Sequence, residues 1–294
     1  MSREAHERQD AFLRHAEAVP TPYVCYRTEN PIHLDGVLDD AAWQKAPKSP
    51  RFVEVVGGGP ALYDTRAAVL WDTDYLYIAF WVEEPFVQAD LTERDAIIFA
   101  ENDVEVFVDG VDTYYELEIN ARNTLYEVFF IWKDAYLRGG PFDRPEFDIY
   151  AANAYTFGGN HDRSTTNFWR GSHPRGARWA FPGWDMPGLK TAVAVDGRMN
   201  DPSHVDRGWT VEIAMPWSGM TALAGGRSVP PRAGDQWRLQ FARYEKLMPS
   251  NHHVGWTWDP VGSTDNHYPE RFTIIQFSDE CIEAVTLPGG EGGT

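Results

Sequence analysis

Carboxylate and amide side chains recur at alternate positions of residues 101–120, where they could bind hydroxyl groups, hold a cation or exchange protons with a ligand. The segment reads ENDVEVFVDGVDTYYELEIN. Successive side chains of a strand point to opposite faces, so two strands here would each carry one acidic and one apolar face. The acidic faces consist of Asp103, Glu105, Phe107 and Asp109, followed by Glu116, Glu118 and Asn120. The intervening DGVDT is typical of a hairpin connection, and pairing of the two strands would place up to four carboxylates in one patch.

The patch allows three roles for Glu105, Glu116 and Glu118. They can form the polar outer face of a half-buried sheet, with no ligand at all. They can accept hydrogen bonds from the hydroxyl groups of a ligand. They can also act as acid and base on a glycosidic bond, because cross-strand neighbours lie about 5 Å apart and repulsion between them raises one pKa. In that enzymatic interpretation the catalytic candidates are Glu105, Glu118 and His267.

Acidic turns offer a second kind of site. WDTDY and DGVD place four candidate calcium ligands in predicted turns, namely Asp72, Asp74, Asp109 and Asp112. Hard cations take oxygen ligands from carboxylates and carbonyls, whereas capping of the turns is the alternative role of these residues. The segments do not follow the EF-hand pattern. The nine histidines lack the H-x-x-x-H and H-E-x-x-H spacings, so a zinc or iron site would need ligands from distant loops.

The charge of the chain limits its partners. With 26 basic and 44 acidic residues the formal net charge is −18, which argues against a nucleic-acid or anionic-membrane partner because phosphates would be repelled. A neutral or cationic ligand fits this charge better. The 12 Trp, 13 Tyr and 16 Phe supply core volume and flat apolar surfaces for ligands.

The ends of the chain bear on localisation and redox state. MSREAHERQDAFLRHAEA has charges where a secretory signal carries its apolar segment, so a cytoplasmic protein is expected; a chain already trimmed of its signal, secreted or periplasmic, would look the same. No run approaches the roughly 20 apolar residues of a spanning helix. Cys25 and Cys281 cannot form a disulfide scaffold, and two unpaired buried thiols are expected rather than one bridge.

Short strands separated by turns make up most of the chain, which predicts an all-β fold, an antiparallel β-sandwich of immunoglobulin or jelly-roll type. The length fits one large β domain with extensions. We expect an N-terminal helical arm over residues 1–20, the sandwich over 21–280 and a flexible tail over 281–294. DDAAWQKA predicts one short helix.

Residues 134–188 resemble a loop-rich insertion more than sheet. Loops beyond about 12–15 residues are uncommon in compact domains unless they form lids, binding loops or contacts. The insertion carries positive side chains that could cover the acidic patch or meet a second subunit, with a solvated loop as the alternative: Arg163, Arg170, Arg175 and Arg178.

Seven phrases in order resemble the family 9 carbohydrate-binding module and its single-domain relatives, a β-sandwich group of the DOMON-like class. They are IHLDGVLDDAAWQKA, AVLWDTDYLYIAFWVEEP, NDVEVFVD, YYELEIN, GWTVEIAMPW, AGDQWRLQFAR and PERFTIIQF, and they run from about Ile32 to Phe277 without the insertion. The resemblance implies a site in which two aromatic rings clamp a terminal sugar while charged and amide side chains bind its hydroxyls. By the same resemblance Glu105 and Asn120 match sugar contacts of the module.

The chain departs from the module at three positions of that site. Glu118 stands where the module has a sugar-binding arginine. The first clamping tryptophan aligns nearest Phe99. The second aligns near Asn266, and Trp256 and Trp258 lie close enough upstream to replace it.

The expected function is recognition of a sugar or oligosaccharide on an acidic, aromatic-lined face; the alternative is a glycosidase or lyase that uses carboxylates of the same face. The expected ligand-binding residues are Phe99, Glu105, Glu118, Asn120, Trp256, Trp258, Asn266 and His267. No cofactor is required by this reading, calcium being the candidate because some members of the module family carry it. An oligomer formed through the insertion is a further possibility that the sequence offers.

Overall fold

Strands form most of the computed structural model, which describes residues 22–159, 173–248, 250 and 252–286. The predicted helical arm over residues 1–20 lies outside this range, as do Arg163 and Arg170 of the insertion. The strands are β1 (Tyr23–Arg27), β2 (Val53–Glu54), β3 (Thr65–Trp71), β4 (Tyr75–Glu83), β5 (Asp103–Asp109), β6 (Thr113–Asn120), β7 (Leu125–Trp132), β8 (Tyr155–Phe157), β9 (Arg178–Phe181), β10 (Lys190–Asp196), β11 (Gly208–Pro216), β12 (Gln236–Leu247), β13 (His252–Thr257) and β14 (Thr273–Cys281).

Helices are few and short in the described residues. The helix α2 (Ala41–Lys45) confirms the one predicted from DDAAWQKA. The remaining helical turns are of the 3₁₀ type: η1 (Ile98–Ala100), η2 (Pro145–Phe147), η4 (Thr221–Leu223) and η5 (Pro269–Arg271). None of these helices is both long and apolar enough to span a bilayer.

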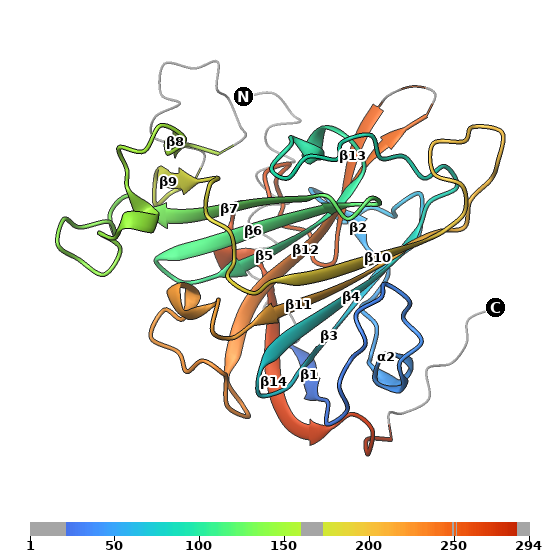
Figure 1. Cartoon of the computed structure of the whole chain (residues 1–294), viewed down its shortest axis with the longest axis horizontal. Coiled ribbons are helices and arrows are strands. Elements are labelled where there is room, and N and C mark those ends of the chain that lie inside the picture. Colours follow the sequence, from blue (N-terminus) through green and yellow to red (C-terminus); the bar gives the residue numbers. More distant parts are fainter. Residues whose placement is uncertain (1–21, 160–172, 249, 251, 287–294) are drawn as a thin grey trace.

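The strands follow one continuous hydrogen-bonded path, in the order β10-β11-β4-β3-β1-β14-β12-β5-β6-β7-β9-β8, with β13 and β2 attached through β12. Figure 1 shows β11, β4 and β3 side by side in one array and β5, β6 and β7 side by side in another. Most pairs are antiparallel, but β1 pairs in parallel with both β3 and β14. The sheet is therefore mixed, and the prediction of a purely antiparallel sandwich is wrong at this strand.

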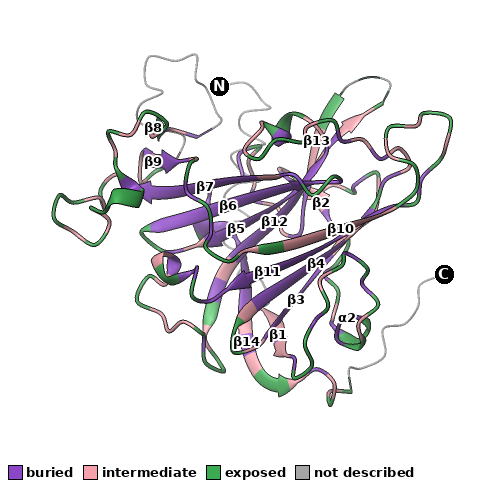
Figure 2. Ribbon diagram, in the orientation of Figure 1, coloured by how far each residue is buried: buried purple, intermediate pink, exposed green. Residues whose placement is uncertain are grey.

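The main hydrophobic core lies between the two arrays because their inward side chains alternate with period two. In β4 the residues Leu76, Ile78 and Phe80 enter this core, and in β5 it receives Val104 and Val106. Strands β6 and β7 contribute in the same way (Figure 2). This arrangement, two packed arrays around one core, is that of a β-sandwich.

The outer face of the β5-β6-β7 array is also buried. A second apolar cluster covers it, including Phe107 of β5, Tyr114 of β6 and Phe130 of β7. The acidic positions of β5 and β6 lie on this same face, because they alternate with residues that enter the main core. The predicted separation of valines from acids is thus confirmed.

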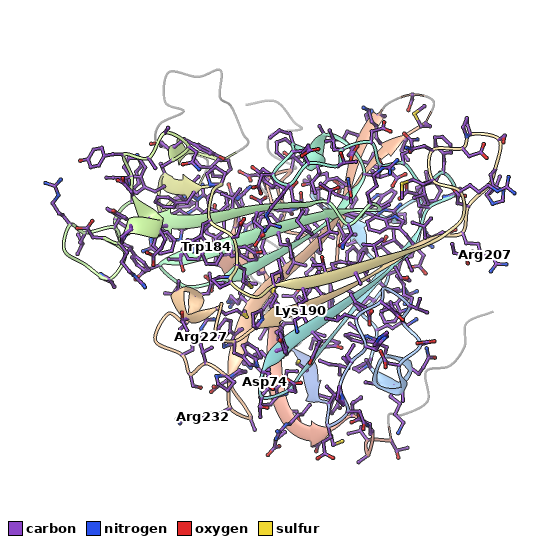
Figure 3. The ribbon with its side chains drawn as sticks, viewed as in Figure 1. Asp74, Trp184, Lys190, Arg207, Arg227 and Arg232 are labelled. Atoms are coloured by element: carbon purple, nitrogen blue, oxygen red, sulfur yellow. The ribbon has the colours of Figure 1, made fainter. Side chains whose placement is uncertain are left out.

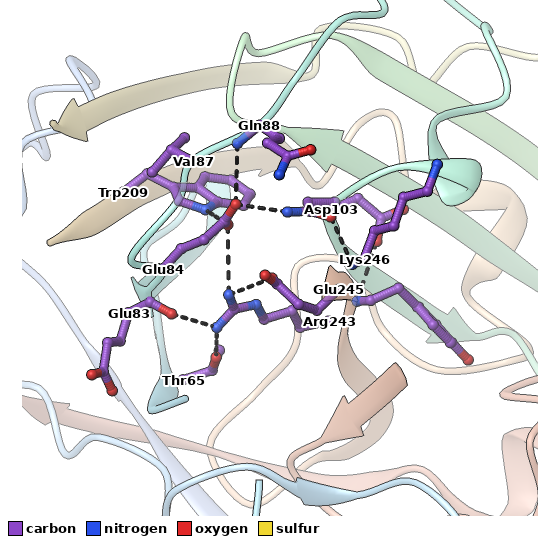
Figure 4. Close-up of polar contacts among 12 residues, drawn as sticks. Thr65, Glu83, Glu84, Val87, Gln88, Asp103, Trp209, Arg243, Glu245 and Lys246 are labelled. Carbon is purple, nitrogen blue, oxygen red and sulfur yellow. Dashed lines mark hydrogen bonds and ion pairs between the residues drawn. The ribbon is translucent and has the colours of Figure 1, made fainter. Parts of the chain in front are cut away.

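A buried arginine links the two arrays. Arg243 of β12 is ion-paired with Glu84 at 3.5 Å and with Glu245 at 2.6 Å, and all three side chains are at most 5% exposed. Figure 4 shows the hydrogen bonds that surround it. Glu84 also accepts from the amide of Asn102 (2.7 Å) and the indole of Trp209 (2.7 Å). Asn102 directly precedes β5, so this network fixes the start of the strand that carries the acids.

Residues 134–188 contain more sheet than predicted. Strands β8 and β9 extend the edge of the sheet beyond β7, and β9 pairs with both β7 and β8. Arg175 forms ion pairs with Asp112 and Asp134, while buried Arg178 donates to the carbonyl oxygen of His267. Neither described arginine reaches the acidic side chains of β5 or β6 through a hydrogen bond.

The C-terminal boundary is later than predicted. Ile282 is fully buried, and the carboxylate of Glu283 accepts hydrogen bonds from the side chains of Thr28 (2.8 Å) and Asn30 (3.1 Å). Both cysteines are free; Cys25 is buried as expected, whereas Cys281 is half-buried. Residues 281–286 are therefore part of the ordered fold, and 287–294 of the predicted tail lie outside the described residues.

Candidate functional site

The hairpin of β5 and β6 brings its acids together on one face. Glu105 lies opposite Glu118, and Phe107 lies opposite Glu116. Asp103, Glu105, Glu116 and Glu118 are 0%, 4%, 6% and 1% exposed. A polar outer face open to solvent, one of the three roles considered for these glutamates, does not describe them.

A cavity of about 230 Å³ lies over this acidic face. Glu105, Glu116 and Glu118 form its acidic side. Its other lining residues come from η1, β5, β7, β8, β12, β13 and the segment before η5: Phe99, Phe107, Tyr126, Phe130, Tyr155, Phe157, Tyr244, His253, Thr264, Asn266 and His267. We call this space the acid-lined cavity.

Asn266 lines the acid-lined cavity beside Glu105. Its amide nitrogen donates to Glu105 Oε2 at 3.2 Å and to the hydroxyl of Tyr244 at 3.1 Å. Asn266 is 3% exposed, and its Oδ1 atom has no hydrogen-bond partner among the described residues. An amide oxygen is a good acceptor, so this atom is available to a donor or a cation in the cavity.

His267 lies in an aromatic surrounding on the opposite side. Its ring centroid is 4.4 Å from that of Phe157 and 5.2 Å from that of Phe130. Nδ1 lies 3.1 Å from the hydroxyl of Tyr114, and Nε2 lies 3.6 Å from Glu116 Oε1. These contacts fix the orientation of the imidazole and direct Nε2 toward an acid of the cavity.

Three of the buried acids form a tight group, which we call the three-carboxylate cluster: Asp103, Glu105 and Glu118. One oxygen of each lies within 4.8 Å of the others. Asp103 Oδ2 and Glu118 Oε2 have no hydrogen-bond partner among the described residues. Within the same residues, none of the ion pairs includes a member of this cluster.

Burial dominates the electrostatics of these acids. Desolvation raises the pKa of Glu105 to about 8, although the hydrogen bond from Asn266 opposes the shift. Burial and, next, the charge of Asp103 raise the pKa of Glu118, and burial with the charge of Glu105 raises the pKa of both Asp103 and Glu116. A carboxylate in a poorly solvated site favours its neutral form unless a cation stabilises its charge.

The structure gathers five of the eight residues predicted to bind ligand. These line the acid-lined cavity: Phe99, Glu105, Glu118, Asn266 and His267. Phe99 is 42% exposed and packs edge-on against Tyr126. The three candidate catalytic residues, Glu105, Glu118 and His267, are among the five.

Asn120, Trp256 and Trp258 lie elsewhere. Asn120 is fully buried, and its amide donates to Glu101 at 2.7 Å and to a carbonyl oxygen at 3.0 Å. Its side-chain oxygen accepts from two backbone N–H groups. The two tryptophans are at most 6% exposed and belong to the main core. Their packing shows structural roles, and neither lines the cavity.

Three of the four candidate calcium ligands of the turns, Asp72, Asp109 and Asp112, have local partners for their side chains. Asp72 Oδ1 accepts from the backbone N–H groups of Asp74 and Tyr75, both at 2.7 Å. Asp109 accepts from the N–H of Val111 at 2.8 Å, and Asp112 pairs with Arg175. Figure 3 places Asp74 at the turn between β3 and β4. These contacts are those of turn capping, the alternative role of these residues.

Several lining residues were not predicted. Tyr155 and Phe157 belong to β8, inside the segment expected to be loop, and Tyr244 lies in β12. His253 directly follows His252, in a segment without the histidine spacing of a metal site. The alternation of polar and aromatic residues in YEVFFIW could have indicated Tyr126 and Phe130, but nothing in the sequence indicates that β8 reaches the same cavity.

Comparison with known proteins agrees with this architecture. Residues 34–136 match the family model described as carbohydrate family 9 binding domain-like. A family 9 carbohydrate-binding module from Caldicellulosiruptor kristjanssonii, solved with cellotriose, is 14% identical over 91% of this chain and 100% of that chain, with a TM-score of 0.50. A candidate carbohydrate-binding protein from Bacteroides uniformis is 15% identical over 88% of this chain and 100% of that one, with a TM-score of 0.52.

The family match covers the hairpin that carries the acids and the strands on both sides of it, β3 to β7. The two solved structures, at such low identity, show a shared fold. No curated protein matches the chain. Residues 34–136 are therefore similar in sequence to the carbohydrate family 9 binding domain-like family, and the chain shares its fold with the two solved structures.

Proposed function

We propose that the protein binds carbohydrate and that one sugar unit enters the acid-lined cavity. The observation that carries this proposal is the placement of hydrogen-bond acceptors and aromatic rings around a single small space. Sugar hydroxyls are donors that carboxylate and amide oxygens can accept, and the C–H face of a pyranose packs on aromatic rings. Glu105, Glu118 and Asn266 supply the acceptors, and Phe99 and Tyr126 supply rings.

The size of the cavity favours a terminal unit. Pockets for drug-sized ligands measure roughly 300–1,000 Å³, and this one measures about 230 Å³. A longer glycan would therefore place one unit in the cavity and extend past Phe99, which is 42% exposed. The cellotriose bound by the Caldicellulosiruptor module makes β-linked glucose oligomers the first ligands to test.

Isothermal titration calorimetry with glucose, cellobiose, cellotriose and a wider glycan panel tests the proposal. We expect saturable binding of at least one glycan and a loss of at least about tenfold in affinity on Phe99→Ala and on Glu105→Gln, since truncation of a hot-spot contact costs about 2 kcal/mol or more. Tyr150→Ala, which removes a ring 77% exposed and outside the cavity, is the matched control. Unchanged affinity in Phe99→Ala and Glu105→Gln would contradict this site, and no binding across the panel would contradict the function.

The glycosidase or lyase alternative gains no support from the comparisons, since neither the matched family nor the two structures is described as an enzyme. Chromatography of the same glycans after long incubation tests it directly. Appearance of products that vanish in Glu118→Gln would replace the binding proposal with an enzymatic one.

Finer expectations belong to this proposal. We propose a DOMON-like class for the sandwich and a place in carbohydrate breakdown, supported by the resemblance of the seven sequence phrases. An oligomer formed through residues 134–188 stays a prediction, which light scattering of the protein in solution would test.

A further inference from the structure

We propose that the three-carboxylate cluster of Asp103, Glu105 and Glu118 binds a calcium ion at the base of the acid-lined cavity. The site differs from the acidic turns in position and in kind. Its ligands come from the faces of two paired strands, whereas Asp72 and Asp109 of the turns cap backbone N–H groups.

The spacing of the oxygens suits calcium. Ca²⁺ binds oxygen at about 2.3–2.6 Å, so two ligands of one ion can lie up to about 4.6–5.2 Å apart. One oxygen from each of the three residues lies within 4.8 Å of the others. A single ion between them can therefore contact all three without movement of the strands.

The cluster also has free acceptor atoms. Asp103 Oδ2 and Glu118 Oε2 have no hydrogen-bond partner among the described residues, although both side chains are almost completely buried. Buried polar atoms are nearly always paired, so two unpaired carboxylate oxygens in one group point to a ligand. The unpaired Oδ1 of Asn266, whose amide nitrogen contacts Glu105, is a further independent acceptor at the edge of the group.

Two other buried acids of this protein have a positively charged partner within the fold. Glu84 and Glu245 are also buried, and Arg243 pairs with both. No Lys or Arg within the described residues forms an ion pair with the three-carboxylate cluster. Because unpaired buried charge is costly, a divalent cation is the partner that satisfies both the charge and the oxygen geometry.

The remaining coordination positions face the cavity. Ca²⁺ takes 6–8 oxygen ligands, more than the three carboxylates supply if each binds through one oxygen. Glu105 and Glu118 line the cavity, so water or neighbouring hydroxyls of a sugar can complete the shell. This step rests on the proposed carbohydrate binding; the cation site itself does not.

Direct titration of the full-length, chelator-treated protein tests the cation site without any sugar. We expect saturable binding of one Ca²⁺ per chain by calorimetry, and saturable Tb³⁺ luminescence sensitised by the nearby tyrosines. Glu118→Gln and Asp103→Asn should each weaken Ca²⁺ binding at least about tenfold, because each removes an anionic ligand. Cooperative thermal unfolding of the calcium-free variants is the check that they are folded. Glu118→Gln also keeps the shape of the side chain.

Asp74→Asn is the matched control, because it removes one carboxylate from an exposed turn. We expect its Ca²⁺ affinity to equal that of the unchanged protein. A Ca²⁺ affinity that is unchanged in Glu118→Gln and Asp103→Asn, or that is lost in Asp74→Asn, would overturn the assignment. Absence of saturable Ca²⁺ binding, or binding of glucosamine by its ammonium group in place of Ca²⁺, would also overturn it.

A second titration separates the two proposals. Glycan affinity measured with Ca²⁺ and with chelator should differ at least about tenfold if the ion contacts the sugar, a free-energy difference of about 1.4 kcal/mol. Equal glycan affinities, with Ca²⁺ binding intact, would show that the ion does not contact the sugar, and they would not contradict the cation site. Loss of glycan binding in both conditions would contradict the proposed function alone.

Discussion

Two groups of buried acids in this protein differ in whether an arginine is paired with them. Arg243 contacts Glu84 and Glu245 on the inner side of β12, whereas no arginine in the described part of the chain forms an ion pair with the three-carboxylate cluster on the outer side of the same array. The resemblance to the family 9 module implies an arginine where this chain has Glu118. An arginine at position 118 would give these acids a fixed positive partner, whereas Glu118 leaves their charge to be balanced by protons or by the calcium ion proposed above.

The Arg243 group makes a prediction about pH. Burial is the largest cause that raises the pKa of Glu245, to about 8, with Arg243 acting against it. A pKa raised in the folded state means that the folded protein holds this proton more tightly than the unfolded chain. Its contribution to stability is therefore complete below the unfolded pKa and is lost as the pH rises through about 8.

Glu245→Gln imitates the protonated side chain and still offers Arg243 an oxygen. We expect its free energy of unfolding to fall less than that of the unchanged protein between about pH 6 and about pH 9. Urea unfolding at several pH values measures the two slopes. Identical slopes, or a steeper one in the variant, would contradict this account of Glu245.

At the scale of elements, the β5-β6 hairpin places the acids, and its turn carries backbone strain. Val111 has φ of +69° and is 53% exposed. A β-branched residue rarely adopts this left-handed conformation, whereas Asn tolerates it. The turn therefore holds its register by the pairing of the strands and not by the preference of its own residue.

Val111→Asn should raise the free energy of unfolding by about 1 kcal/mol, because it relieves a left-handed β-branched residue. Val205→Asn, at a residue 79% exposed and outside the positive-φ positions, is the control and should change stability by less than about 0.5 kcal/mol. Chemical denaturation compares the two. A destabilised Val111→Asn would show that the side chain contributes more by packing than its conformation costs.

The elements also show what the sequence could predict. Alternation alone separated Val104, Val106 and Leu117 from Glu105 and Glu118, because a strand has one core face whatever its partners. The burial of those acids could not be inferred, because it depends on segments far apart in the chain. Strand β8 and the residues before η5 reach the same face through pairing that no local pattern encodes.

The two tryptophans predicted to bind ligand lie outside the cavity for a related reason. Trp256 and Trp258 lie close to the aligned position in the sequence, but β13 pairs with β12 and turns both rings toward the main core. Asn266, aligned near that position, is the residue that enters the cavity. Proximity along a strand does not decide which face a side chain takes; register does.

At the scale of the whole molecule, the net charge of −18 attracts cations over the entire surface, whereas a neutral sugar experiences little of this field. We expect Ca²⁺ affinity to fall as salt is added, since salt screens the long-range attraction. Affinity for a neutral glycan, measured at constant saturating Ca²⁺, should change less than about twofold over the same range. Calorimetry at low and high sodium chloride measures the two affinities. An equal dependence of the Ca²⁺ and glycan affinities on salt would contradict this expectation.

Strand β1 has a consequence for the order of folding. It lies between β3 and β14, and along the described path the connection between the two arrays runs through β1, β14 and β12. During synthesis the β3 neighbour of β1 leaves the ribosome well before residues 273–281 of β14. The second edge of β1 therefore stays open to pairing with other strands until the last strand described here has been made. We expect the β1–β14 pairing, and with it the connection between the arrays, to form late in folding.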